Sequence, residues 1–323
     1  MSDRHPPWRE ASTATRGQAG WLPLVKSQPH RGFTLIELLV VVTVIAILLA
    51  ILVSSLRKAR ETARRVVCIG HLRQLQIAWL TYAENHDGAI VSGMPFYHIY
   101  EKLPDEPSWL SCVHYGDHSS KARVNALMRT GALARYVGDV SVYRCPSQYE
   151  LPQMPGWEPW LRWFSAYAIV SSMNCLTPEQ RAAAEAQFVE FRGPSPVRAY
   201  IKKLSELSPP GPAQRMVFVD VGCPYWTMQG PADFYMMAGP STRQRGWTTF
   251  GHGPPLQHGN GTCTSFADGS VRYWKWKDPR TIAWSQAWLQ LYQAGQTGPR
   301  PEPPPDPDNR DYSEFYKAIW GRF

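Results

Sequence analysis

Glu37 is the first residue whose type and position could do chemistry, because it lies near the start of a long apolar run. From Leu38 to Val53 the chain reads LLVVVTVIAILLAILV, in which Thr43 is the only polar side chain. A carboxylate buried in hydrocarbon costs up to about 3 kcal/mol. We therefore expect Glu37 to have a cationic partner and a function.

A second candidate group lies between His258 and Gly269, where the chain reads HGNGTCTSFADG. An Asp-Gly pair between two runs of strand-forming residues predicts a β-hairpin, with Asp268 capping the turn and Gly269 at positive φ. The alternative is a divalent-metal site formed by His252, His258 and either Asp220 or Asp268, since imidazole and carboxylate suit such an ion. Because neither a helical HExxH spacing nor a DxDxDG-like calcium loop is present, the sequence predicts no metal and no cofactor.

Thiols are a third source of chemistry, and the six cysteines are Cys68, Cys112, Cys145, Cys175, Cys223 and Cys263. None belongs to a CxxC pair, so neither a thioredoxin-like site nor a zinc ribbon is indicated. If the domain lies in an oxidising compartment, at least one pair among the five cysteines after Cys68 is expected to form a disulfide. Cys68 itself is interpreted as a small buried apolar residue.

The apolar run is long enough to cross a membrane. From Phe33 to Leu56 it has 24 residues, or about 36 Å of helix, against a hydrocarbon core of about 30 Å. The competing interpretation is a secretory signal peptide, which has a shorter apolar region followed by a small-residue cleavage site. Val53-Ser54-Ser55 is a poor version of that site, so residues 33–56 are predicted to form a transmembrane helix.

The stretch that begins at Arg31 reads RGFTLIELLVVV and resembles the processing site of type IV prepilins and type II secretion pseudopilins. The resemblance implies that a prepilin peptidase cuts between Gly32 and Phe33 and methylates the new amine of Phe33. It also implies that Glu37 neutralises the terminal amine of a neighbouring subunit during filament assembly. Residues 1–32 would then be a cytoplasmic leader, and the later domain would lie on the periplasmic or extracellular side of the inner membrane.

The charges beside the predicted span conflict with this orientation. Five basic and two acidic residues precede the span, and five basic and one acidic residue follow it within residues 57–65. The positive-inside rule alone would weakly favour the opposite orientation. We give precedence to the processing motif, because its peptidase works on the cytoplasmic side.

The helix is expected to continue from residue 57 to residue 84, because this stretch has no proline and one glycine. Two stripes at helical spacing run along it: Ala59, Ala63, Val66 and Gly70, then Cys68, Leu72, Leu75, Trp79 and Tyr82. Asn85-His86-Asp87-Gly88 supplies turn residues that end the helix. A hydrophobic helix with an amphipathic second half resembles the spine of a pilin.

The remaining sequence is typical of an α+β domain with an antiparallel sheet packed on the long N-terminal helix. Strands are predicted over 140–144, 164–170, 215–220, 262–267 and 270–276. Helices are predicted over 178–191, 279–291 and 312–323, the last as a short docking helix after a proline-rich linker over 299–308. The predicted organisation is a leader (1–32), a transmembrane helix (33–56), a helical spine (57–84), a globular domain (85–298) and a linker with a tail (299–323).

The stretch from His258 to Gly269 also resembles the H-X9-DG motif near the C terminus of many prepilin-like proteins of planctomycetes and their relatives. Other segments fit the same group, namely 68–82, 136–147 and 218–220. His71 stands where this group would have asparagine. The resemblance covers most of the chain from Gly32 to about Trp276, but it implies no molecular role for His258, Asp268 or Gly269.

The function predicted from these features is that of a structural pilin-like or pseudopilin subunit rather than an enzyme. Its expected partners are the prepilin peptidase, other pilin or pseudopilin subunits with their assembly machinery, and the inner membrane. The net charge of +8 would suit nucleic acid, but the basic residues are scattered and no nucleic-acid-binding motif accompanies them. Two alternatives stay open. One is a carbohydrate-binding adhesin whose exposed tryptophans, among Trp157, Trp160, Trp163, Trp274 and Trp276, would stack on sugars. The other is a tethered metal-dependent hydrolase, although GxSxG is absent.

Overall fold

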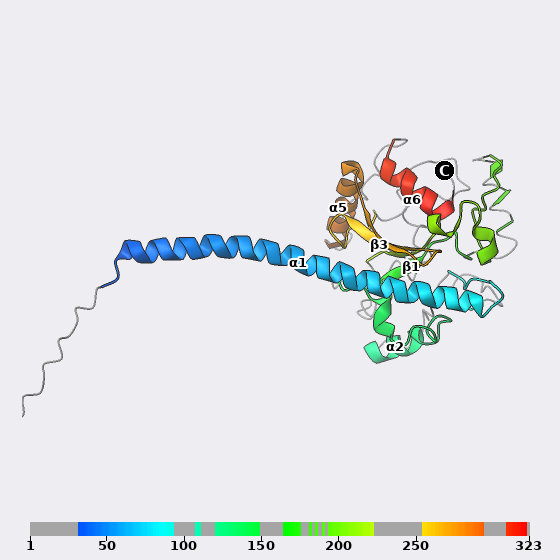
Figure 1. Cartoon of the computed structure of the whole chain (residues 1–323), viewed down its shortest axis with the longest axis horizontal. Helices are drawn as coiled ribbons and strands as arrows, with labels where there is room; N and C mark the ends of the chain where they lie inside the picture. Colours follow the sequence, from blue (N-terminus) through cyan, green and yellow to red (C-terminus); the bar gives the residue numbers. More distant parts are fainter. Residues whose placement is uncertain are drawn as a thin grey trace, which may run out of the picture. The chain divides into compact units, whose positions relative to one another are not determined.

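The fold is α+β, as predicted. The computed structural model describes residues 32–93, 107–110, 120–148, 164–175, 181–182, 185–186, 189–190, 193–222, 254–293 and 308–321. Its main elements are the 50-residue helix α1 (Leu35–Glu84) and a four-stranded antiparallel sheet (Figure 1). This combination confirms the α+β, pilin-like fold class. The chain forms two compact units, Met1–Val53 and Ser54–Phe323, so the second part of α1 belongs to the same unit as the sheet.

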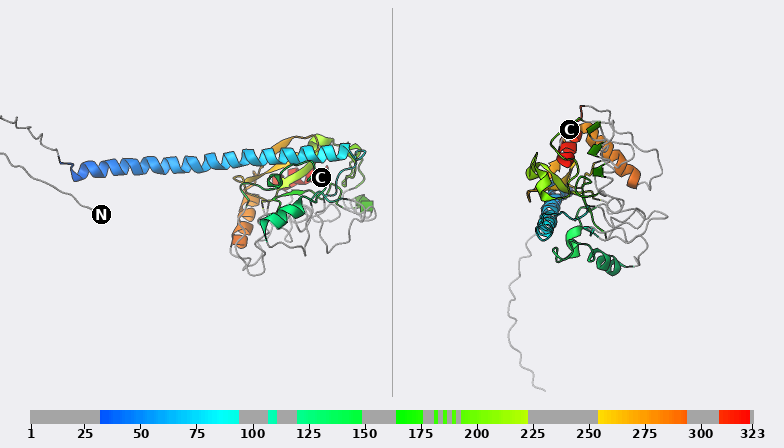
Figure 2. Two further views of the ribbon diagram at one scale, coloured as in Figure 1. Left: turned by 90° about the horizontal axis from the view of Figure 1, so that it is seen from below. Right: turned by 90° about the vertical axis from the view of Figure 1, so that its right-hand side faces the viewer.

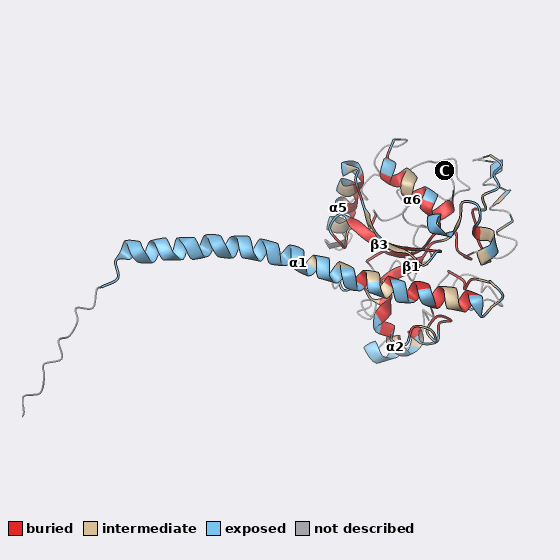
Figure 3. Cartoon of the chain, viewed as in Figure 1, coloured by how far each residue is buried: buried red, intermediate tan, exposed pale blue. Residues whose placement is uncertain are grey.

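Only the second of the two stripes predicted on α1 packs in the core. Cys68, Leu72, Leu75, Trp79 and Tyr82 are buried (Figure 3). The prediction for the first stripe was wrong, since its four members are exposed, Val66 by 62%. Cys68 lies two residues after Val66, or about 200° around the helix, so the two stripes occupy different sides and only the second faces the domain.

The sheet has the strand order β1-β2-β3-β4, and every neighbouring pair is antiparallel. Its strands are β1 (Tyr167–Ile169), β2 (Met216–Asp220), β3 (Gly261–Phe266) and β4 (Val271–Lys275). The strands predicted over 164–170 and 215–220 and the hairpin around Asp268-Gly269 are therefore confirmed.

The prediction of a strand over 140–144 was wrong. Val140–Tyr143 instead forms the 3-10 helix η1, which follows the helix α2 (Lys121–Met128). The Asp139 carboxylate accepts the backbone N–H of Ser141 at 3.0 Å. This local hydrogen bond stabilises a turn and competes with extended backbone.

Helices cover both faces of the sheet. On one face, Gln76 of α1 accepts a hydrogen bond from Ser265 of β3. On the other face, Phe315 of α6 (Arg310–Trp320) packs against the ring of Trp274 in β4. The sheet accordingly lies between the second part of α1 and α6 in Figure 1 and in the end-on view of Figure 2. Side chains alternate between the two faces along each strand, which explains why every residue of β3 is buried.

The predicted C-terminal helices are also present. The helix α5 (Pro279–Gln293) confirms the prediction over 279–291, and α6 confirms a docking helix, since Tyr312, Phe315, Tyr316, Ile319 and Trp320 are buried. The helix predicted over 178–191 is described only in part, and its described residues are helical. The predicted linker over 299–308 lies outside the described residues, apart from Asp308. The same is true of three tryptophans, Trp157, Trp160 and Trp163.

The β3–β4 turn has the chemistry that the sequence predicts. Asp268 Oδ1 accepts the N–H and the hydroxyl of Ser270 at 2.9 and 2.7 Å, and Gly269 has φ +89°. A Cβ added at Gly269 would meet only Leu80, at 3.8 Å, which is an ordinary contact. The backbone conformation, and not a lack of space, therefore disfavours other residues at this position.

Gly269→Val is therefore expected to lower the free energy of unfolding by about 1–3 kcal/mol, because a β-branched residue resists positive φ. Denaturant unfolding of the full chain in detergent measures this change. Gly269→Asn is the control and should cost less, since asparagine tolerates this region. Equal costs for valine and asparagine would contradict a backbone origin.

Candidate functional site

The start of α1 contains a capping box formed by Thr34 and Glu37. The Thr34 hydroxyl oxygen accepts the N–H of Glu37 at 3.2 Å, and Glu37 Oε2 accepts the N–H of Thr34 at 2.8 Å. The Thr34 hydroxyl also donates to Glu37 Oε2 at 2.7 Å. Such reciprocal bonds satisfy backbone donors that a helix start leaves unpaired. Glu37 therefore has a local structural role beside any role in assembly.

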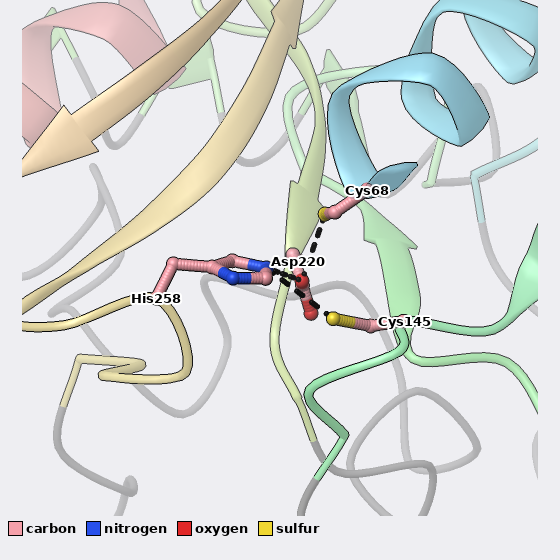
Figure 4. Close-up of side chains that lie close together, drawn as sticks. All are labelled: Cys68, Cys145, Asp220 and His258. Carbon is pink, nitrogen blue, oxygen red and sulfur yellow. Dashed lines mark hydrogen bonds and ion pairs between the residues drawn. The ribbon is translucent and has the colours of Figure 1, made fainter. Parts of the chain in front are cut away.

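The second candidate site is a buried cluster of Cys68, Cys145, Asp220 and His258 (Figure 4). Cys68 Sγ donates to Asp220 Oδ2 at 3.1 Å, and His258 Nε2 lies 3.2 Å from the same oxygen. His258 Nε2 also lies 3.3 Å from Cys145 Sγ. One atom from each of the four side chains lies within 4.8 Å of the other three.

Four separate parts of the fold place these side chains. Cys68 begins the buried stripe of α1, Cys145 follows η1, and Asp220 ends β2. His258 lies in the turn before β3, and its ring points toward Asp220 (Figure 4). The exposed fractions of Cys145 and His258 are 4% and 2%, and those of Cys68 and Asp220 are zero.

A shell of hydrogen bonds holds the cluster in place. His258 Nδ1 lies 2.8 Å from Glu61 Oε1 of α1, and Glu61 in turn accepts the Ser147 hydroxyl at 2.9 Å. The N–H of Gly222 donates to Asp220 Oδ1 at 2.9 Å, as does the amide of Gln257 at 3.4 Å. Glu61 is thus part of the site although its side chain is one-third exposed.

The electrostatics of the cluster centre on His258. Burial disfavours its charged form, but hydrogen bonds with Asp220, Cys145 and Cys263 outweigh burial and raise the pKa of His258 far above its usual range. The hydrogen bond with Cys68 is the largest influence on the neighbouring Cys263 thiol, whose pKa is lowered to about 7. Burial raises the pKa of the Cys68 thiol well above its usual value. Without a bound ion, a protonated His258 would therefore pair with Asp220 and, through Nδ1, with Glu61.

This arrangement allows two kinds of chemistry. The first is nucleophilic catalysis, in which an imidazole activates a thiol and a carboxylate orients the imidazole. His258 contacts both the Cys145 thiol and the Glu61 carboxylate in this way. Catalysis would require a substrate to reach the Cys145 sulfur. The burial of Cys145 argues against such access. Two thiols, an imidazole and a carboxylate converging on one point also form a set of metal ligands.

The comparisons with known proteins cover only part of the chain. The prokaryotic N-terminal methylation motif matches residues 28–53. The chain has a prepilin-type N terminus. The ComG operon protein 3 homolog of Bacillus licheniformis is 40% identical over 59 residues, which are 18% of this chain and 61% of that protein. The chain thus spans about three-fifths of the length of the curated relative it matches. No solved structure matches the chain.

The prepilin-type motif includes Gly32, Phe33 and Glu37, the three residues that the sequence assigns to processing and assembly. Gly32 and Phe33 are both exposed and precede the first turn of α1. The family match therefore supports a prepilin-like N-terminal region.

The structure brings together only some of the residues considered for a metal site. Asp220 and His258 are in contact, whereas Asp268 caps the turn at the far end of β3. His252 lies outside the described residues. Sequence analysis missed Cys68 and Cys145, although Cys68 stands on the buried stripe that it identified.

The expected disulfide finds no support among the described cysteines. The four described cysteines, Cys68, Cys145, Cys175 and Cys263, are buried and form no disulfide, while Cys112 and Cys223 lie outside the described residues. The Cys175 thiol donates to the Met173 carbonyl at 3.4 Å and takes no part in the cluster around His258.

His71, at the position where an asparagine was expected, has Nδ1 2.9 Å from the Arg144 carbonyl oxygen.

Proposed function

We propose that this chain is a pilin-like or pseudopilin subunit that is processed by a prepilin peptidase and assembles into a filament. One observation carries the proposal: the prepilin-type motif stands at the start of a single 50-residue helix with two different halves. Large apolar side chains of the first half are exposed, whereas the second half supplies the core of a domain. A filament subunit needs both surfaces, one for the membrane and for neighbouring helices and one for its own domain.

The first half of α1 suits a membrane. By length and composition α1 can cross a bilayer, and its large apolar residues from Leu35 to Val53 are at least 46% exposed. We propose that residues 33–56 span the inner membrane with the leader in the cytoplasm and the domain on the periplasmic or extracellular side. Residues 57–84 would be the extramembrane half of the spine, and the globular domain would extend over 85–298.

Processing and assembly supply the proposed partners. Cleavage between Gly32 and Phe33 would leave the new amine one residue before Thr34, at the start of α1. We propose that the Glu37 carboxylate of one subunit neutralises this amine on a neighbouring subunit. The partners are then the prepilin peptidase, other pilin or pseudopilin subunits with their machinery, and the inner membrane.

Glu37 variants test the assembly role, provided that the capping box is separated from the charge. Glu37→Gln keeps an acceptor for the N–H of Thr34 but has no charge, whereas Glu37→Leu loses both. We expect both variants to insert in the membrane and both to be depleted from sheared filament fractions. The measurement is the ratio of filament to membrane protein by immunoblotting.

A capping role alone gives a different result. Glutamine would then restore assembly to the wild-type level, and only leucine would reduce it. Thr34→Ala removes the cap without altering the Glu37 charge and serves as the matched control. Wild-type assembly of the glutamine variant would contradict the charge-pairing role.

A further inference from the structure

We propose that Cys68, Cys145, Asp220 and His258 bind a zinc ion that joins α1 to the sheet. This site is independent of filament assembly and gives the stretch that begins at His258 a molecular role. The proposal rests on the positions of the four ligand atoms, on the groups behind them and on the chemistry of the set.

The four ligand atoms already lie within 4.8 Å of one another. In a tetrahedral zinc site, metal–ligand bonds of about 2.0–2.3 Å place neighbouring ligand atoms about 3.3–3.8 Å apart. The contacts Cys68 Sγ–Asp220 Oδ2, His258 Nε2–Asp220 Oδ2 and Cys145 Sγ–His258 Nε2 are 3.1, 3.2 and 3.3 Å. Small outward movements of the side chains would therefore admit the ion without moving the backbone.

The groups behind the ligands are those that a metal site requires. His258 presents Nε2 to the centre while Nδ1 faces Glu61 at 2.8 Å, which is the carboxylate–histidine–metal arrangement. Asp220 presents Oδ2, because its other oxygen accepts from Gly222 and Gln257. The Ser147 N–H lies 3.4 Å from Cys145 Sγ, where it would stabilise a thiolate.

A central cation could replace the hydrogen bonds within the cluster. His258 Nε2 carries at most one hydrogen, yet both Asp220 Oδ2 and Cys145 Sγ lie within 3.3 Å of it. A central cation can instead be bound by the ring nitrogen, the carboxylate oxygen and both sulfur atoms at once. Both thiols would lose their protons on binding.

The donor set selects the ion. Two sulfur ligands exclude calcium and magnesium, which take oxygen ligands. Sulfur, nitrogen and oxygen together suit zinc, and four protein ligands are typical of a structural site. Because the ligands come from α1, the segment after η1, the end of β2 and the turn before β3, the ion would cross-link parts of the core.

The test uses the full chain, purified in detergent without chelators. We expect about one zinc ion per chain by elemental analysis, as in structural sites. After zinc removal, added Co²⁺ should give thiolate-to-metal absorption in the near ultraviolet. A chelator should lower the melting temperature of the zinc-loaded chain.

Variants assign the ion to the cluster. Cys145→Ser should lose the zinc, while Cys175→Ser, which alters a buried cysteine outside the cluster, should retain it. Glu61→Ala changes a partly exposed residue behind His258, so it should fold and bind zinc about 10–100-fold more weakly. Glu84→Ala, on the exposed side of α1, is its control.

Three results would overturn the proposal. The wild-type chain could contain no zinc and take up neither Zn²⁺ nor Co²⁺. Cys145→Ser could retain as much zinc as Cys175→Ser. Peptide mapping could instead find a disulfide between Cys68 and Cys145 in the isolated protein.

Discussion

Trp79→Ala is expected to lower the free energy of unfolding by about 3–5 kcal/mol. The Trp79 side chain is fully buried on α1, and its removal would leave a large cavity in the core of the domain. This loss is a large part of the roughly 5–15 kcal/mol that stabilises a typical domain. Denaturant unfolding of the full chain in detergent, followed by fluorescence or circular dichroism, measures it.

Ile77→Ala is the matched control on the same helix. Ile77 is 57% exposed, so its truncation should change the free energy of unfolding by no more than about 0.5 kcal/mol. Similar losses for the two variants would contradict the assignment of the second half of α1 to the core. The same burial implies that a fragment beginning after Glu84 would lack part of its own core, so soluble fragments should begin near Ser54.

Asp220→Ala should destabilise the chain by a comparable amount, about 3–5 kcal/mol, because it breaks a buried ion pair and leaves the partly exposed Glu61 as the remaining counter-charge of His258. Asp220 and His258 are both buried, and His258 Nε2 lies 3.2 Å from Asp220 Oδ2. Zinc-free protein isolates this effect from any contribution of a bound ion. Thermal and denaturant unfolding both measure it.

Asp268→Ala provides the comparison at the other end of β3. Asp268 is exposed and bonds only to Ser270 among the residues described, so its loss should cost about 1 kcal/mol. Equal costs for the two aspartates would contradict the difference in their environments. The comparison also separates the two ends of the stretch from His258 to Gly269: one end joins the core and the other forms a turn.

Sequence reasoning predicted the elements whose signals are local. The apolar run, the second stripe of α1, the Asp-Gly hairpin and the C-terminal docking helix each depend on residue types within one short stretch, and each is present. The segment over 140–144 shows how such signals fail. Its alternation of apolar and polar residues favours a strand, but the Asp139 side chain stabilises a turn that the alternation does not reveal.

The buried cluster could not be predicted in the same way, because its contacts join distant parts of the chain. Cys68 and Asp220 are 152 residues apart, and Cys145 and His258 are 113 residues apart. Only the sheet order and the packing of α1 bring them together. The capping box is different, because Thr34-Leu35-Ile36-Glu37 has the required spacing in the sequence. It could therefore have been predicted from the sequence.

The most direct test of the account is the mass of the N-terminal peptide of the mature chain, isolated from membranes of a host with a prepilin peptidase. We expect a peptide that begins with N-methylated Phe33. We also expect that Gly32→Asp retains the complete leader, because the peptidase needs a small residue before the cleavage site. A wild-type chain with an intact leader, or one that begins near Ser55 as after signal-peptide cleavage, would contradict the account.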